Sequence, residues 1–173
     1  MPRPLIYFFA GAALLLVLLP LLRSVLASPP SASALTDRGY EALGKGNHAE
    51  AMEAFERALE SLRPADPQYV RAKMGAVEAW IRADASKARK EFLELATSQP
   101  EEIGSREYAA VASKMAAAKQ FVAAIDVLDA GIQAHPEDPK LKATMDEVKA
   151  AAQKAGDPDA VKKLISLGYL GGE

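Results

Sequence analysis

The chain lacks cysteine and carries few aromatic residues and little net charge. Its 173 residues include no cysteine, 6% aromatics and a formal net charge of −2. The absence of cysteine excludes disulfide frameworks, thiol nucleophiles, cysteine-ligated zinc and a lipidated N-terminal cysteine. The small net charge argues against broad electrostatic capture of nucleic acid. Half of the residues are apolar, and because most of these are Ala, Leu, Val and Ile, the composition favours helices over sheet.

Residues typical of catalysis are also scarce. The chain has two histidines: His48 falls in a turn between two expected helices, and His135 comes just before a helix-closing proline. They lack metal-ligand spacing, and the chain contains no H-E-x-x-H motif, phosphate-binding glycine loop or G-x-S-x-G elbow. The glutamates around Glu53 recur every three or four residues, as on a solvated helix face. We therefore expect no enzymatic activity, no cofactor and no metal ion.

The first 27 residues predict a membrane anchor or a signal segment. Residues 5–22 read LIYFFAGAALLLVLLPLL without a charge, and such a helix would be about 27 Å long, close to the thickness of a bilayer core. A secretory signal usually has an apolar run of about 7–15 residues. The longer run here favours an uncleaved anchor over a signal cleaved after Ala27. A buried core helix is the least favoured interpretation, since such helices are seldom apolar on every face.

The charges around this segment predict its orientation. The amino terminus and Arg3 precede the run and Arg23 follows it, which favours an N-terminus inside the cytoplasm and a domain outside. We expect a single-pass protein of a bacterial inner membrane with its C-terminal domain in the periplasm, or a soluble periplasmic or secreted protein if the segment is cleaved. Residues 28–33, rich in Pro and Ser, predict a semi-rigid linker, and residues 34–173 predict one helical domain.

A small–large–small pattern with spacings of four and three residues recurs along this domain. A small residue lets two helices approach closely, and the larger residue one turn later fills the gap between helix pairs. The three copies are offset by 37 and then 36 residues, and Pro100 and Pro136 close the second and third. The copies are Ala51, Phe55 and Ala58; Ala88, Phe92 and Leu95; and Ala124, Leu128 and Gly131.

This pattern resembles the tetratricopeptide repeat, whose second helix carries small, aromatic and small residues at these intervals and ends before a proline. The resemblance implies an all-α fold, a right-handed α-solenoid of stacked antiparallel helix pairs. About three repeats would cover residues 32–65, 69–102 and 105–138, with capping helices at 139–170 and one transmembrane helix before them. The first helix of the middle repeat aligns equally well around Gly75 or Ala76.

Helix boundaries follow from capping signals. Three Asp-Pro pairs, at residues 66–67, 138–139 and 157–158, predict helix starts, because Asp caps the free N–H groups and Pro lacks one. The expected helices cover about 33–45, 48–62, 67–82, 85–98, 102–118, 121–134, 139–155 and 158–167.

The resemblance also implies a binding surface. In solenoids of this type the first helices line a concave groove that takes an extended peptide or a partner helix. The groove positions carried over from the family are Tyr40, Leu43, Lys73, Val77, Trp80, Arg106 and Ser113. Trp80 is the only tryptophan. It is either an interface anchor, a role in which tryptophan is enriched, or a core residue.

These observations predict a non-enzymatic adaptor or scaffold for protein–protein interaction, held at the membrane through residues 5–22. Its expected role is to assist the assembly, secretion or quality control of envelope proteins. Two alternatives remain open: a membrane-bound scaffold that assembles with copies of itself as a homo-oligomer, and an accessory subunit of a separate enzyme.

Overall fold

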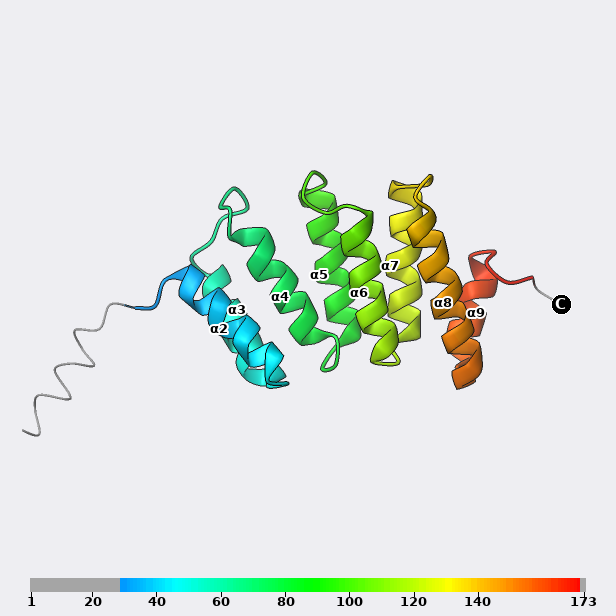
Figure 1. Ribbon diagram of the computed structural model, residues 1–173, viewed down its shortest axis with the longest axis horizontal. Helices are drawn as coiled ribbons and strands as arrows, with labels where there is room; N and C mark the ends of the chain where they lie inside the picture. The colour runs from blue at the N-terminus through cyan, green and yellow to red at the C-terminus, as the bar shows by residue number, and fades with distance from the viewer. Residues whose placement is uncertain (1–28, 172–173) are drawn as a thin grey trace, which may run out of the picture. The chain divides into compact units, whose positions relative to one another are not determined.

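In the computed structural model the described residues, 29–171, form eight helices and no strand (Figure 1). The all-α expectation is therefore confirmed. The compact helical unit begins at Ser31, so part of the predicted linker belongs to the start of the first helix. The helices are α2 (Ala32–Gly44), α3 (His48–Leu59), α4 (Tyr69–Trp80), α5 (Ala85–Ser98), α6 (Ser105–Ala117), α7 (Phe121–Ala134), α8 (Pro139–Ala155) and α9 (Pro158–Ser166).

The predicted membrane segment, residues 5–22, and the cleavage site after Ala27 lie outside the described residues. Within residues 29–171, none of the helices has both the length and the apolar character needed to span a bilayer.

The helices follow one another in a row (Figure 1). Most helices pack against the next one along the chain, and α2 with α4, α5 with α7, α6 with α8 and α7 with α9 are also in contact. α3 and α5 lack a backbone contact like the one between α5 and α7, although both α3 and α5 pack against α4. This wider spacing leaves part of α4 accessible between them.

Two of the three Asp-Pro helix starts are confirmed. The Asp138 side chain accepts a hydrogen bond from the backbone N–H of Lys140 at 2.8 Å, and that of Asp157 accepts one from Ala160 at 3.0 Å. In both helices proline occupies the first turn, where its missing N–H costs no helical hydrogen bond.

The helix start predicted at residues 66–67 is wrong. The Asp66 carboxylate accepts a hydrogen bond from the backbone N–H of Arg63, which precedes it, at 2.6 Å. The Asp66 carbonyl then accepts from the N–H of Tyr69 at 2.9 Å. The pair thus closes a turn, and α4 begins two residues beyond the proline, at Tyr69.

The repeated faces of the second helices form the centre of the core. Ala51, Phe55 and Ala58 on α3 are fully buried, as are Ala88 and Phe92 on α5 and Ala124 and Leu128 on α7. The first helices bury residues at the same intervals of four and three. These are Leu35, Gly39 and Ala42 on α2; Ala72, Ala76 and Ala79 on α4; and Tyr108, Ala112 and Met115 on α6. This burial favours the alignment of the middle repeat around Ala76.

The same spacing continues into the segment predicted as capping helices. Ala160 and Leu164 on α9 and Leu167, the residue that follows it, lie 36 residues beyond Ala124, Leu128 and Gly131, respectively. Ala160 and Leu164 are fully buried, and Leu167 packs against the same core. The fourth helix pair therefore packs by the same spacing, with a large residue at the third position.

The described part of the C-terminal tail folds back onto the helices. The Tyr169 hydroxyl donates a hydrogen bond to Asp129 Oδ1 on α7 at 3.0 Å, and the Tyr169 N–H donates to the Leu164 carbonyl at 2.9 Å. Burial, then the hydrogen bond and negative charge of Asp129, raise the pKa of Tyr169 to about 12. These contacts pack the described part of the tail against α7 and α9.

The hydrophobic core is not continuous along the row. One large cluster joins α4 through α9. Two smaller clusters, centred on Phe55 and on Ala58, hold α2 and α3 against α4. Phe55 packs edge-on against Tyr40 with ring centroids 5.0 Å apart, so the first helix pair has an aromatic core of its own.

Candidate partner-binding cleft

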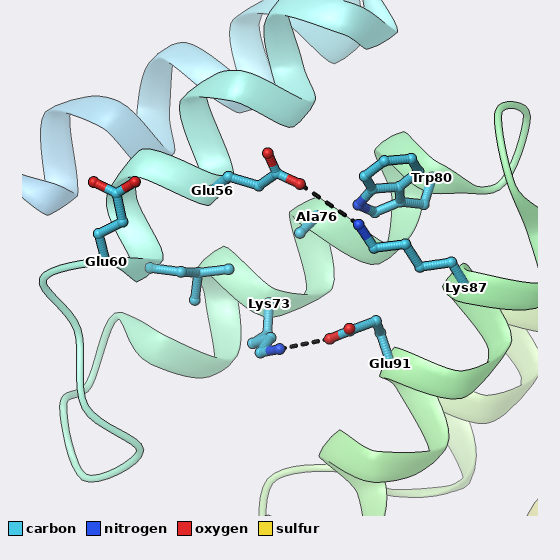
Figure 2. A pocket seen from close by; sticks show the side chains of 8 residues that line it. Glu56, Glu60, Lys73, Ala76, Trp80, Lys87 and Glu91 are labelled. Atoms are coloured by element: carbon cyan, nitrogen blue, oxygen red, sulfur yellow. Dashed lines mark hydrogen bonds and ion pairs between the residues drawn. The ribbon is translucent and has the colours of Figure 1, made fainter.

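An open cleft lies over α4 between α3 and α5 (Figure 2). Its volume is 340 Å³, and we call it the Trp80 cleft. α3 contributes two acids and a leucine, α4 a lysine, an alanine and the tryptophan, and α5 a lysine and an acid. The lining residues are Glu56, Leu59, Glu60, Lys73, Ala76, Trp80, Lys87 and Glu91.

Helical periodicity brings these side chains together. On α4 and α5 the lining residues are three, four or seven positions apart, and Leu59 and Glu60 lie three and four positions after Glu56 on the α3 side, so each helix presents one stripe to the cleft. Ala76 is small enough to leave the middle of α4 open, and the stripes of α3 and α5 form the two walls. Leu59, Ala76 and Trp80 provide the apolar surface.

Trp80 is partly exposed. It also packs against the large core cluster, so it has features of both sequence interpretations, core residue and exposed aromatic. The Lys87 Nζ lies 3.5 Å from the centroid of the Trp80 ring, in a cation–π arrangement. The same ammonium is 3.6 Å from Glu56 Oε1 on the opposite wall, as Figure 2 shows.

A second ion pair crosses the cleft. Lys73 Nζ donates to Glu91 Oε2 at 2.6 Å, and about a quarter of each side chain is exposed. Among residues 29–171, Glu60 forms no ion pair. The lining thus combines three carboxylates with two ammonium groups, a net charge of about −1 at neutral pH.

The other predicted groove residues do not line the Trp80 cleft. Leu43 lines a second hollow, of 390 Å³, where the C-terminal ends of α2, α4 and α6 meet. Arg106 and Ser113 line a third, of 380 Å³, between α6 and α8. Of the seven predicted positions, the structure brings Lys73 and Trp80 together in one cleft.

Val77 requires a correction. Its side chain is 1% exposed and belongs to the large core cluster, so it cannot contact a partner. Tyr40 is partly exposed, but its hydroxyl donates to the Arg71 carbonyl at 2.8 Å, and the Arg71 guanidinium lies 5.0 Å from its ring centroid. Burial raises the pKa of Tyr40 above its usual value. Tyr40 therefore holds α2 to α4.

The second helices contribute residues that the sequence prediction missed. Glu56, Leu59 and Glu60 on α3 and Lys87 and Glu91 on α5 line the cleft. The family's groove positions lie on first helices, so a carry-over from the family cannot reach them. The one available signal was the spacing of the α3 glutamates, and it indicates a solvated face equally well.

A further charged cluster ties second helices together. Asp126 on α7, whose side chain is 13% exposed, pairs with Arg89 on α5 and with Lys163 on α9, the latter at 2.6 Å. Its acceptor atoms are both engaged, which makes it a link between three helices. Within residues 29–171, no three His, Asp or Glu side chains are grouped so that they could hold a metal ion.

No protein-family model matches this chain, and no curated protein matches it. The chemistry of the Trp80 cleft therefore has to be inferred from its own residues. An aromatic face, an apolar floor and paired charges suit reversible binding of another molecule.

Proposed function

We propose that this chain is a non-enzymatic interaction protein of tetratricopeptide type, and that a protein partner binds in the Trp80 cleft. One observation carries the proposal: the chain's only tryptophan is partly exposed in the lining of an open cleft. Tryptophan is enriched among the residues that dominate binding energy, particularly where apolar contacts surround it. Leu59 and Ala76 contribute further apolar surface to the lining of the same cleft.

The repeated spacing supports a right-handed α-solenoid as the scaffold. Three second helices, α3, α5 and α7, bury residues at intervals of four and three, and α5, α7 and α9 also pack in sequence. In a solenoid each repeat contacts its neighbours and leaves extended surfaces for a partner. Such surfaces suit an adaptor that holds an extended segment of another protein.

We further propose that residues 5–22 hold this module at a bacterial inner membrane, with the helical domain in the periplasm. The uncharged run and the charges on either side of it support this arrangement. The role would then be in assembly, secretion or quality control of envelope proteins. A reporter enzyme fused after Glu173 tests the orientation, and reporter activity in the cytoplasm would refute it.

Self-assembly is the less favoured alternative. Stacking between copies would require an apolar patch on an exposed end of the row. Among residues 29–171, Ile165 is the one large apolar side chain that is exposed, at 43%, and single exposed apolar residues are normal on protein surfaces. Sedimentation of the detergent-solubilised chain over a range of concentrations tests this point, since mass that rises with concentration would revive the alternative.

The central experiment is site-specific photo-crosslinking in native membranes. A photoreactive residue replaces Glu60 at the cleft or, as a control, Lys142, which is exposed on α8. We expect one identified protein to be captured from position 60 and not from position 142. Capture should fall at least tenfold in Trp80→Leu while the helical circular dichroism stays unchanged. Unchanged capture in a folded Trp80→Leu variant would refute the proposed site.

A further inference from the structure

We propose that the Trp80 cleft recognises an arginine side chain of the partner protein, which takes the place of Lys87 over the Trp80 ring. This inference rests on the proposed function and adds the chemistry of the partner. The evidence is that a cation from the chain itself already occupies the position. The Lys87 ammonium lies 3.5 Å from the ring centroid and 3.6 Å from Glu56 Oε1.

The position suits a guanidinium better than an ammonium. Arginine is planar, stacks on aromatic faces and is more weakly hydrated than lysine, and it pairs with carboxylates through two parallel hydrogen bonds. Trp80 supplies the aromatic face, and Glu56 supplies a carboxylate on the opposite wall (Figure 2). Lys87 lies over the Trp80 ring, but its ammonium is 3.6 Å from the Glu56 carboxylate, which is longer than a hydrogen bond.

Lys87 can leave without disturbing the core. Its side chain is 38% exposed and its partner Glu56 is 55% exposed, and exposed ion pairs of this kind contribute little to stability. When Lys87 turns into solvent, Glu56, Glu60 and Glu91 remain in the lining with Lys73 as the one cation. The lining then carries a net charge of about −2 at neutral pH, with Glu91 still paired with Lys73.

The floor of the cleft fits the rest of an arginine side chain. Leu59 and Ala76 line the same cleft as Trp80, and arginine commonly buries its aliphatic stem along apolar surface while its charged head stays near water. A carboxylate from an acidic partner would instead approach Glu56 and Glu60, where repulsion opposes binding. Charge complementarity thus selects a basic segment.

Because Trp80 is the only tryptophan, tryptophan emission, excited selectively over that of the tyrosines, comes from this cleft alone. The test titrates the full chain, solubilised in detergent, with three short capped peptides that differ at one central position: arginine, norleucine or glutamate. We expect saturable quenching or a spectral shift with the arginine peptide. Binding of the other two should be at least tenfold weaker.

Variants of the chain then separate the contributions. Lys87→Met removes the internal cation and should strengthen binding of the arginine peptide about threefold or more, whereas the double change Glu56→Gln and Glu60→Gln should weaken it about tenfold. Lys114→Met is the matched control, because Lys114 pairs with Glu78 at another hollow, and it should change nothing. Circular dichroism checks that each variant is folded.

The outcomes distinguish this inference from the proposed function. Equal binding of the norleucine and arginine peptides, or no gain in Lys87→Met, would overturn the role of arginine. The proposed function would still stand in that case if position 60 captured a partner and if this capture depended on Trp80. If crosslinking instead identified a different contact surface for the physiological partner, the proposed function would be refuted, and the inference about the partner's arginine with it, whichever peptide the cleft binds.

Discussion

The ring of Phe55 on α3 lies directly against Gly75 on α4, the first helix of the next pair. A Cβ atom at Gly75 would be closer than 3.0 Å to three atoms of that ring, and the same holds for a Cβ at Gly39 on α2. One phenylalanine thus fills the space between two glycines from different helix pairs. The first and second pairs are joined at this point.

Replacing Gly75 should weaken this joint. We expect Gly75→Ala to lower the free energy of unfolding by about 1–3 kcal/mol, because overpacking forces the ring or the helices to move. Gly44→Ala, at the end of α2 with no atom within 4 Å of the new methyl group, should be neutral or stabilising by up to about 1 kcal/mol. Urea unfolding followed by circular dichroism measures both, and equal effects would contradict the packing argument.

A double variant refines this prediction. Combining Gly75→Ala with Phe55→Leu should cost less than the sum of the two single changes, since the smaller side chain makes room for the methyl group. Strict additivity would show that Phe55 is not the residue that Gly75 accommodates.

Lys119 offers a stabilising substitution. It follows the C-cap of α6 with φ of 61°, the one positive φ outside glycine among the described residues, whereas Gly46 and Gly156 adopt this conformation after α2 and α8. Relief of about 1–2 kcal/mol of backbone strain, less about 0.5–1 kcal/mol for added flexibility, predicts that Lys119→Gly stabilises the fold by up to about 1 kcal/mol. The reverse change, Gly46→Ala, should destabilise it, and thermal unfolding checks both signs.

The Asp126 cluster should contribute more to stability than an exposed ion pair. Asp126→Asn leaves Arg89 and Lys163 without their shared carboxylate, and we expect a loss of about 1–3 kcal/mol. Glu41→Gln, which breaks the exposed pair between Glu41 and Lys45, should have a much smaller effect, because solvent screens exposed ion pairs. Chemical denaturation of the two variants provides the comparison, and a neutral Asp126→Asn would refute the linking role.

The tail contact predicts a pH dependence. The pKa of Tyr169 is about 12 in the folded chain against an ordinary value of 10.0. Between these values the unfolded chain has lost the proton and the folded chain still holds it, so stability falls as the pH rises through this window. The contribution is fully present below pH 10.

Tyr169→Phe isolates this effect. The variant should be less stable than the parent chain by about 1 kcal/mol at pH 8, because the hydrogen bond to Asp129 is lost. The difference should shrink above pH 10. Tyr40 and Tyr108 also have pKa values raised by burial, so the difference between the two chains is the quantity to measure. A constant difference up to pH 11 would exclude Tyr169 as its source.

Much of the fold could be predicted because its determinants are local. The intervals between Ala51, Phe55 and Ala58 define one helix face, and a face of that composition needs a neighbouring helix. The turn at Asp66 was missed for a local reason as well. An aspartate can bond to N–H groups before or after it in the chain, and an Asp-Pro pair alone does not distinguish these cases.

The site was harder to predict because it depends on distances between helices. Val77 and Trp80 lie one turn apart on α4, yet Val77 is covered by the large core cluster and Trp80 is partly open. The difference arises from the wide spacing between α3 and α5. No single residue in the sequence indicates that spacing. Residue patterns indicate which face of a helix is apolar, whereas packing decides which part of that face stays accessible.

The break in the hydrophobic core bears on cooperativity. Because α2 and α3 are held by clusters separate from the one that joins α4 through α9, the first helix pair can unfold locally while the rest keeps its core. Trp80 lies at this boundary, so its emission follows the opening of the first pair, whereas ellipticity averages over all the helices. The unfolding transition followed by Trp80 emission is then expected to differ from the one followed by ellipticity.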